Sequence, residues 1–337
     1  MRFHAVALWA AAAALCWDAA ASACRANDSS AELSVGGLVF TKNSDVSIQS
    51  EDLTITPDNV TVRYVFLNES PNPVTLTIAF PLPDIDLADG ANVAFPVGDP
   101  VNFVGFSTKV DGKAINFTIN QRAFLNSKDV TAALRGLGIP LLPIGQAQLR
   151  ITELPQQVRD RAVTEGLLAQ SGTNDKGEPL YDPTWVLKTS VVRQQTFPSG
   201  KPVTVEHRYR TSVGMSFDTV LRAGLRQKKA LDSEVQRYRA NYCVDEDFLK
   251  SLDKVAGADE ANKARIQERR ISYVLKTGAN WAGPIKDFHL VVDKGQPDRL
   301  VSFCGDGIKK ISPTAFEMRT KDFTPVQNLN IIMLGRK

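Results

Sequence analysis

Few side chains in this 337-residue chain could carry catalysis. Beyond the first 26 residues the only histidines are His207 and His289. His207 alternates with Val203, Val205 and Tyr209, so we expect it to face the apolar side of a strand. A histidine without a paired nucleophile favours a core or interface role over catalysis. We expect His289 to point to solvent.

The motifs of the common enzyme classes are missing from the sequence. There is no Gly-x-Ser-x-Gly, His-Glu-x-x-His or Cys-x-x-Cys motif, and there is no glycine-rich phosphate loop. We therefore predict no catalytic residues, no metal site and no cofactor. Glycosidases need only two carboxylates that the fold brings together. A hydrolase of envelope glycans or peptides therefore stays open as the alternative function.

One loop could offer oxygen ligands to a cation. Asp84, Asp86 and Asp89 lie close together in the sequence, as ligands of Ca²⁺ often do. Their spacing is not that of an EF-hand loop, and no glutamate follows at the twelfth position. We regard this loop as a weak candidate calcium site, and a solvated turn is the favoured interpretation.

The chain begins with the features of a secretory signal peptide. A short polar start is followed by an apolar run and then by small residues, and we expect cleavage near residue 26. Cleavage after Ala23 would instead make Cys24 the first residue, and the protein would be lipid-anchored through Cys24. We therefore predict a periplasmic or secreted protein. No second long apolar run follows, so we predict no transmembrane helix.

Two cysteines lie far from this segment, Cys243 and Cys304. Exported proteins usually pair their cysteines, so we predict a disulfide between them. The net charge of +3 argues against a nucleic-acid binder, which needs a strongly basic face. The basic runs 226–229 and 265–270 contain or adjoin acidic residues, and we expect solvated helix faces there.

The remaining pattern predicts a mainly β fold. Val60, Val62, Tyr64 and Phe66 alternate with polar residues, and residues 74–80 alternate in the same way after a Pro- and Asn-rich turn. Asp111-Gly112 predicts a hairpin turn. Further strands are expected at 33–41, 46–56, 103–110, 115–119, 185–197, 202–212, 271–276, 288–292, 300–304, 316–319 and 329–334.

Two segments interrupt the strands with helical periodicity, and we expect helical insertions at about 125–172 and 226–262. We therefore expect antiparallel β-sandwich units with helical insertions. The predicted organisation is a signal peptide at 1–26, a β-sandwich at 27–213 with the first insertion, and a helical segment followed by a C-terminal β unit at 214–337.

Motifs near the two ends of the predicted mature chain carry a resemblance. The sequences NDSSAEL and GGL stand at 27–33 and 36–38, and TGANW, GPI and DF stand at 277–281, 283–285 and 287–288. Together they resemble an uncharacterised family of exported bacterial proteins, classed only as a domain of unknown function. This resemblance implies an envelope location and supplies no catalytic residues.

A second resemblance covers residues 58–125. The sequences YVFLN, FPLP and VDGK at 64–68, 80–83 and 110–113 are similar to the N-terminal β-sandwich domain of inter-alpha-trypsin inhibitor heavy chains. That domain is an interaction module, so this resemblance implies a β-sandwich that takes part in binding.

These observations favour a non-catalytic binding or interaction module of the cell envelope. Its partner would be another envelope protein or a cell-wall glycan. Trp185, Trp281 and Phe288 are the candidate contact residues, because aromatic residues dominate binding hot spots. Core packing is the competing interpretation for each of these three residues, and we favour it.

Overall fold

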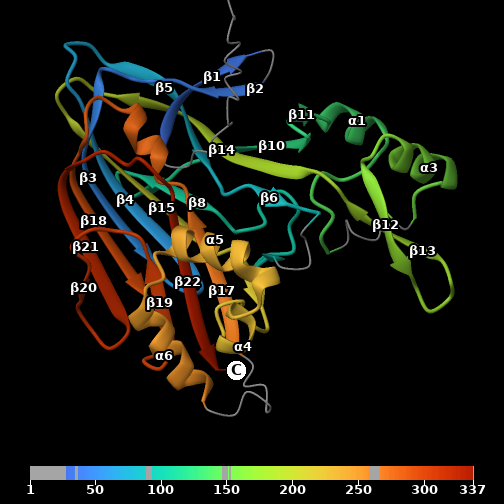
Figure 1. Ribbon diagram of the computed structural model, residues 1–337. Coiled ribbons are helices and arrows are strands. Elements are labelled where there is room, and N and C mark those ends of the chain that lie inside the picture. The colour runs from blue at the N-terminus through green and yellow to red at the C-terminus, as the bar shows by residue number, and fades with distance from the viewer. Residues whose placement is uncertain are drawn as a thin grey trace, which may run out of the picture.

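The computed structural model describes residues 28–34, 37–88, 93–145, 151, 153–257 and 266–336. Most of its regular elements are strands in antiparallel sheets, so the predicted mainly β fold is confirmed (Figure 1). The predicted signal peptide at 1–26, with Cys24, lies outside the described residues. Within the described ranges, no helix combines the length and the apolar character needed to cross a membrane.

The largest sheet has eight strands in the order β20-β21-β18-β3-β4-β15-β8-β9. Strand β18 pairs with β3 in parallel, and the other neighbours in this sheet are antiparallel. The strands are β3 (Val46–Ile55), β4 (Asn59–Asn68), β8 (Ser107–Val110), β9 (Lys113–Ala114), β15 (Pro202–Arg210), β18 (Ile285–Asp293), β20 (Lys309–Lys310) and β21 (Ala315–Phe323).

The predicted period-two pattern is the physical basis of this sheet. In β4, Val60, Val62, Tyr64 and Phe66 are all buried, and the residues between them are more exposed. The expected Asp111-Gly112 turn joins β8 to β9, with positive φ at both residues, as a tight hairpin turn requires.

A seven-stranded sheet packs near the first. Its main order is β11-β10-β14-β5-β1-β2, and β6 pairs with β14. The strands are β1 (Ser29–Ser34), β2 (Gly37–Phe40), β5 (Val74–Pro81), β6 (Ile85–Asp86), β10 (Thr118–Leu125), β11 (Lys128–Asp129) and β14 (Val186–Phe197).

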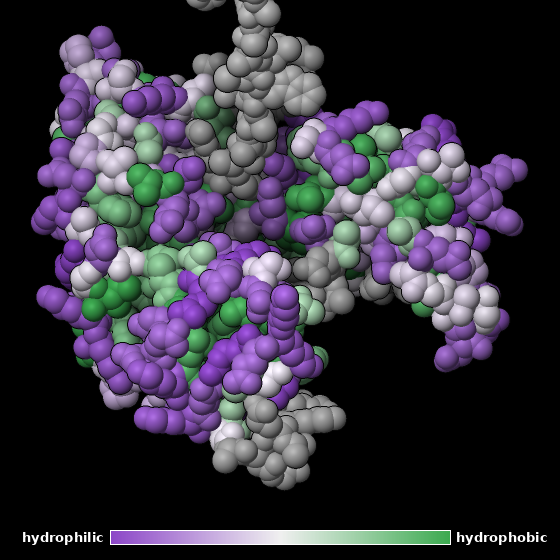
Figure 2. All heavy atoms as spheres, in the orientation of Figure 1, coloured by the Kyte–Doolittle hydropathy of each residue, from purple (hydrophilic) through white to green (hydrophobic). Residues whose placement is uncertain are grey.

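The first helical insertion forms an arm beside the main body (Figure 1). It contains helices α1 (Thr131–Gly136) and α3 (Gln156–Thr164), followed by the hairpin β12 (Leu168–Thr173) and β13 (Pro179–Pro183). Hydrophilic side chains dominate its visible surface in Figure 2.

The third large sheet has five strands in the order β19-β22-β17-β16-β7. These are β7 (Val93–Ala94), β16 (Val213–Ser216), β17 (Ile266–Tyr273), β19 (Leu300–Phe303) and β22 (Leu329–Arg336). The second helical insertion covers this sheet (Figure 1) with α4 (Ala223–Arg226), η2 (Lys229–Leu231), α5 (Asp232–Tyr242) and α6 (Glu246–Ala256).

Strand β22 has apolar residues at successive positions, and packing on both of its faces explains this pattern. Ile331 and Met333 belong to the main core, and Ile332 and Leu334 belong to a second core beneath α5 and α6. A strand that is buried on both faces needs apolar residues at successive positions. The helical insertion therefore packs on one face of β22, and the main core packs on the other face of the same strand.

The sheets run across the predicted domain boundary at residue 213. Strands β3 and β4 precede it and β18 and β21 follow it, yet all four lie in the eight-stranded sheet. The main core also contains residues from both segments, such as Phe66 and Phe288. The division at 213/214 stays a prediction about domains and does not separate the sheets.

The predicted disulfide between Cys243 and Cys304 is present. Cys243 follows the last residue of α5 in a left-handed conformation, with φ of 50°, and Cys304 follows β19. The bridge spans a sequence separation of 61 residues and ties the helical insertion to the five-stranded sheet.

Candidate functional site

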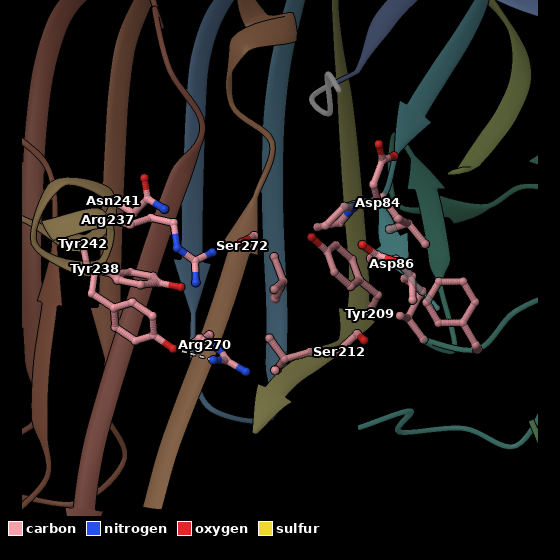
Figure 3. A pocket seen from close by; sticks show the side chains of 18 residues that line it. Asp84, Asp86, Tyr209, Ser212, Arg237, Tyr238, Asn241, Tyr242, Arg270 and Ser272 are labelled. Atoms are coloured by element: carbon pink, nitrogen blue, oxygen red, sulfur yellow. Dashed lines mark hydrogen bonds between the residues drawn. The ribbon is translucent and has the colours of Figure 1, made fainter. Parts of the chain in front are cut away.

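A cleft of about 420 Å³ lies where the helical insertion meets the β framework (Figure 3). One wall comes from α5 and β17, and the other comes from residues 82–86, which follow β5 and include β6. Residues at the end of β15 lie between the walls.

The first wall presents cationic and polar side chains on one face of a helix. Arg237, Tyr238, Asn241 and Tyr242 have the spacing i, i+1, i+4 and i+5, so all four project from the same side of α5. Arg270 and Ser272 are two positions apart on β17 and therefore share a face of that strand. This wall thus carries two guanidinium groups from separate elements.

A network beneath this wall holds Arg270 in place. Arg270 Nη1 donates to the Tyr238 hydroxyl at 2.6 Å and lies 3.0 Å from Glu268 Oε1. The Tyr238 hydroxyl in turn donates to Glu268 Oε1 at 2.9 Å. Because every member has a partner, Arg270 is positioned before any ligand arrives.

Burial controls the protonation of this network. Burial raises the pKa of Glu268, and this effect exceeds the opposing effects of Thr219, Arg270 and Tyr238. Burial and the nearby Glu268 carboxylate also raise the pKa of Tyr238, which keeps its hydroxyl available as a donor.

A glycine makes room for the Arg270 side chain. Gly214 in β16 is the register partner of Arg270 in β17. A Cβ atom at position 214 would lie 3.0 Å from Arg270 Nε, closer than side-chain carbons normally approach. Any larger residue there would therefore displace the guanidinium group.

The opposite wall carries two carboxylates. Asp84 lies 3.4 Å from Lys188 Nζ in an ion pair. Asp86 is exposed, and its Oδ1 accepts a hydrogen bond from the backbone N–H of Ala88 at 3.0 Å. In Figure 3 both carboxylates lie on the side of the cleft opposite Arg237 and Arg270.

Apolar and aromatic side chains also contribute to the lining of the cleft. Leu82, Phe103, Val104 and Tyr209 line it and are all buried. Burial also raises the pKa of Tyr209, so its hydroxyl stays neutral. The cleft therefore combines a few buried apolar side chains with charged groups of opposite sign on its two walls.

A second cluster of charged groups lies inside the protein. The Asp28 carboxylate accepts two hydrogen bonds from Arg193, at 3.2 and 2.8 Å, and lies 3.0 Å from His207 Nε2. These three side chains are at most 2% exposed. The expected inward orientation of His207 is thus confirmed, and the partner of the histidine is a carboxylate far away in sequence.

Burial and charge act in opposite directions on this cluster. Burial alone would raise the pKa of Asp28, but Arg193 and His207 together lower it below its ordinary value. Burial lowers the pKa of His207, and this effect exceeds the favourable effect of Asp28. The cluster is enclosed by the core, so we assign it a structural role.

The cluster also joins the start of the described chain to the segment that precedes β18. Trp281 Nε1 donates to the backbone carbonyl of Asp28, and Asn280 Nδ2 donates to Ser29 Oγ at 2.9 Å. Residues 28–29 of the NDSSAEL motif and residues 280–281 of the TGANW motif are therefore in direct contact. Their co-occurrence in the sequence has a physical reason.

The three candidate contact residues lie in the core. Trp185, Trp281 and Phe288 are 0 to 1% exposed. Trp185 Nε1 donates to the carbonyl of Leu141 at 2.9 Å, and Phe288 stacks on Phe323 at 4.5 Å between ring centroids. The structure thus places all three where the competing interpretation, core packing, located them, and none of them lines the cleft.

The weak candidate calcium loop is only partly described. Asp89 lies outside the described residues, and Asp84 and Asp86 make the contacts given above. Among the residues that the structure describes, no group of three His, Cys, Asp or Glu side chains is arranged to hold a metal ion. His289, expected in solvent, is instead 19% exposed between Asp52 and Glu317.

The first wall of the cleft, with Arg237 and Arg270, was not predicted from the sequence. We expected a solvated helix face at residues 265–270, and this was wrong, because 266–273 form strand β17. The signal that could have identified the strand is the alternation of Ile271 and Tyr273, which are buried, with Arg270 and Ser272. The many charged residues at 265–270 made this alternation of buried and exposed positions difficult to recognise.

The family of the chain follows from comparison with known proteins. The family described as a domain of unknown function, DUF4424, matches residues 26–332, and the chain belongs to this family. The prediction that the chain belongs to a family classed as a domain of unknown function is therefore confirmed, whereas the particular end motifs that suggested it stay a prediction. The resemblance of residues 58–125 to inter-alpha-trypsin inhibitor heavy chains stays a prediction. No curated protein matches the sequence.

Two solved structures show limited similarity. A putative nutrient binding protein from Legionella pneumophila subsp. pneumophila str. Philadelphia 1 is 15% identical, with a TM-score of 0.45 over 92% of this chain and 70% of that chain. A mutant M1 zinc metallopeptidase from Deinococcus radiodurans is 10% identical, with a TM-score of 0.24 over 87% of this chain and 43% of that chain. Neither TM-score reaches 0.5, so we base no argument on these structures.

Proposed function

We propose that this protein is an exported binding module whose ligand site is the cleft between α5–β17 and residues 82–86. The observation that carries this proposal is the cleft itself, about 420 Å³ in volume, with buried apolar side chains in its lining and charged groups at its walls. Small-molecule sites are typically clefts of about 300–1,000 Å³ with apolar linings and a few placed polar groups.

The rigidity of the first wall supports the same proposal. Arg270 is held by Tyr238 and Glu268, and the helix that supplies Arg237 is tied down by the Cys243–Cys304 bridge at its end. A site that is built before the ligand arrives loses less conformational freedom on binding. The cleft therefore favours a small ligand over a large flat partner.

The disulfide supports the export part of the proposal. Disulfides persist in oxidising compartments such as the periplasm and the cell exterior, and they are rare in the cytosol. The expected exported protein begins at residue 27 and contains the bridge. Intact mass of the native protein tests this directly, and a full-length cytoplasmic chain with two free thiols would contradict it.

A ligand panel with a blocked cleft tests the binding part. The panel holds amino acids, dipeptides, sugars, phosphate esters and short carboxylic acids, and the readout is thermal stabilisation. Ser212→Trp fills the cleft, because Ser212 lines it. Ser107→Trp is the control, since both hydroxyls bond a backbone carbonyl, at 3.3 Å for Ser212 and 3.2 Å for Ser107.

The expected hits stabilise the native chain and Ser107→Trp and lose their effect on Ser212→Trp. The hits are recovered chemically intact after incubation. Hits that stabilise Ser212→Trp equally, or the absence of any hit at millimolar concentration, would overturn the proposed site. Cleavage of a glycan or peptide in the panel would favour the alternative hydrolase.

A further inference from the structure

Some charged groups on the two walls of the cleft keep hydrogen-bonding capacity that the described residues do not fill. On the first wall, Arg270 uses Nη1 for Tyr238 and Glu268, and its Nη2 makes no hydrogen bond with a described residue. Arg237 lies over the Tyr238 ring at 5.7 Å, and its ion pair with Glu234 is long, at 3.4 Å, and exposed. Both guanidinium groups thus retain donors for an acidic ligand group.

The second wall retains one acceptor charge. Lys188 balances Asp84, whereas Asp86 has no cationic partner among the described residues. Among the contacts between described residues, only Oδ1 of Asp86 takes part in the turn with Ala88, so Oδ2 retains capacity for a ligand donor. The second wall therefore suits a cationic group.

The two walls together select against simple ions. An anion drawn to Arg237 and Arg270 would also face the Asp86 carboxylate, and a cation drawn to Asp86 would face two guanidinium groups. Only a molecule with both charges satisfies both walls, since like charges brought together in a partly desolvated site cost binding energy. Specificity here comes from repulsion of the wrong ligand as well as from attraction.

From this arrangement we infer that the cleft binds a small dipolar ion, an amino acid or short peptide with free amino and carboxyl groups. The inference rests on the proposed function and names the ligand class of the same site. The carboxylate lies against Arg237 and Arg270, and the ammonium group lies against Asp86.

Isothermal titration with three related compounds tests each end separately. The probes are leucyl-leucine, its N-acetyl derivative and its C-terminal amide. We expect the native protein to bind leucyl-leucine and to bind each blocked derivative about tenfold more weakly, because each lacks one charge-assisted contact.

Variants then assign each end to a wall. In Asp86→Asn the preference for the free amine over the N-acetyl derivative should shrink, with little change in the preference for the free acid. In Arg237→Ala the preference for the free acid over the amide should shrink instead. Both variants must show native melting temperatures before titration.

Matched controls exist for both variants. Asp99 is exposed and caps a backbone N–H two residues ahead at 2.8 Å, as Asp86 does at 3.0 Å, but it does not line the cleft. Arg239 lies on α5 with Arg237 and pairs with Glu246 outside the cleft. Asp99→Asn and Arg239→Ala should leave all three affinities unchanged.

Two different failures are distinguishable. If panel ligands require an open cleft but bind without regard to either charge, the dipolar-ion inference is wrong and the proposed binding site stands. If no compound depends on the cleft, the proposed function itself is wrong. Equal affinity for leucyl-leucine and both blocked derivatives in the native protein would overturn the inference.

Discussion

Replacing Asp28 with asparagine should destabilise the protein strongly, because it leaves a buried cation without its counter-charge. Asp28 accepts two hydrogen bonds from Arg193 and one contact from His207, and all three side chains are enclosed. Removing one partner from a buried ion pair typically costs about 3–5 kcal/mol. We expect Asp28→Asn to lower the free energy of unfolding by about that amount.

A double-variant cycle separates the ion pair from general packing. Arg193→Met alone should also destabilise, since it leaves the Asp28 carboxylate buried and unbalanced. The combination with Asp28→Asn should cost less than the sum of the two single changes, because no buried charge is then left uncompensated. Urea denaturation followed by tryptophan fluorescence measures all three.

An exposed ion pair provides the control for this cycle. Arg161 and Glu165 pair at 2.7 Å on α3, with side chains that are 67% and 36% exposed. Arg161→Met should leave the urea midpoint close to that of the native chain, since exposed ion pairs contribute little. A cost below about 1 kcal/mol for Asp28→Asn, the level of a surface ion pair, would refute the structural role assigned to the buried Asp28 cluster.

Protonation, the disulfide and Trp281 each give a further prediction about stability. The free energy of unfolding should fall as pH drops below about 6.5, because the unfolded chain protonates its histidine while burial keeps His207 neutral. A second fall should begin as pH drops below about 3.8, because the unfolded chain then protonates Asp28 while the lowered pKa keeps the folded carboxylate ionised. Urea midpoints unchanged between pH 7.5 and 5 would contradict the first of these two predictions. The double variant Cys243→Ala/Cys304→Ala should lose about 2–4 kcal/mol of stability in thermal unfolding, because the unfolded chain is no longer constrained. Trp281→Ala should lose about 3–5 kcal/mol through cavity formation and one lost hydrogen bond, and a near-native melting temperature would return Trp281 to a contact role.

Local pattern was sufficient to predict much of the β framework. The alternation of Val60 to Phe66 and the Asp111-Gly112 turn each reflect a rule that acts over a few residues. The parallel pairing of β3 with β18 could not be predicted, because it joins segments more than 200 residues apart and leaves no local trace. The strand content was therefore predictable where the order of the strands was not.

The site was less predictable than the fold. Arg237 and Arg270 come from different elements, and only the packing of α5 on β17 brings them to one wall. The burial of Asp28 could not be predicted either, because an aspartate is normally exposed to solvent. Its partners lie 165 and 179 residues away in the sequence. The location of Trp281 was ambiguous from the sequence, since an aromatic residue in a loop motif suits both a contact surface and a core. The structure buries it.

The proposed function depends above all on the cleft between α5–β17 and residues 82–86 being the binding site. A crystal structure grown with the tightest compound from the ligand panel is the sharpest test of that assignment. We predict ordered ligand density in the cleft, with an acidic group at Arg237 and Arg270 and a basic group at Asp86. Ligand density elsewhere on the protein, with the cleft empty at saturating concentration, would show that the assignment is wrong.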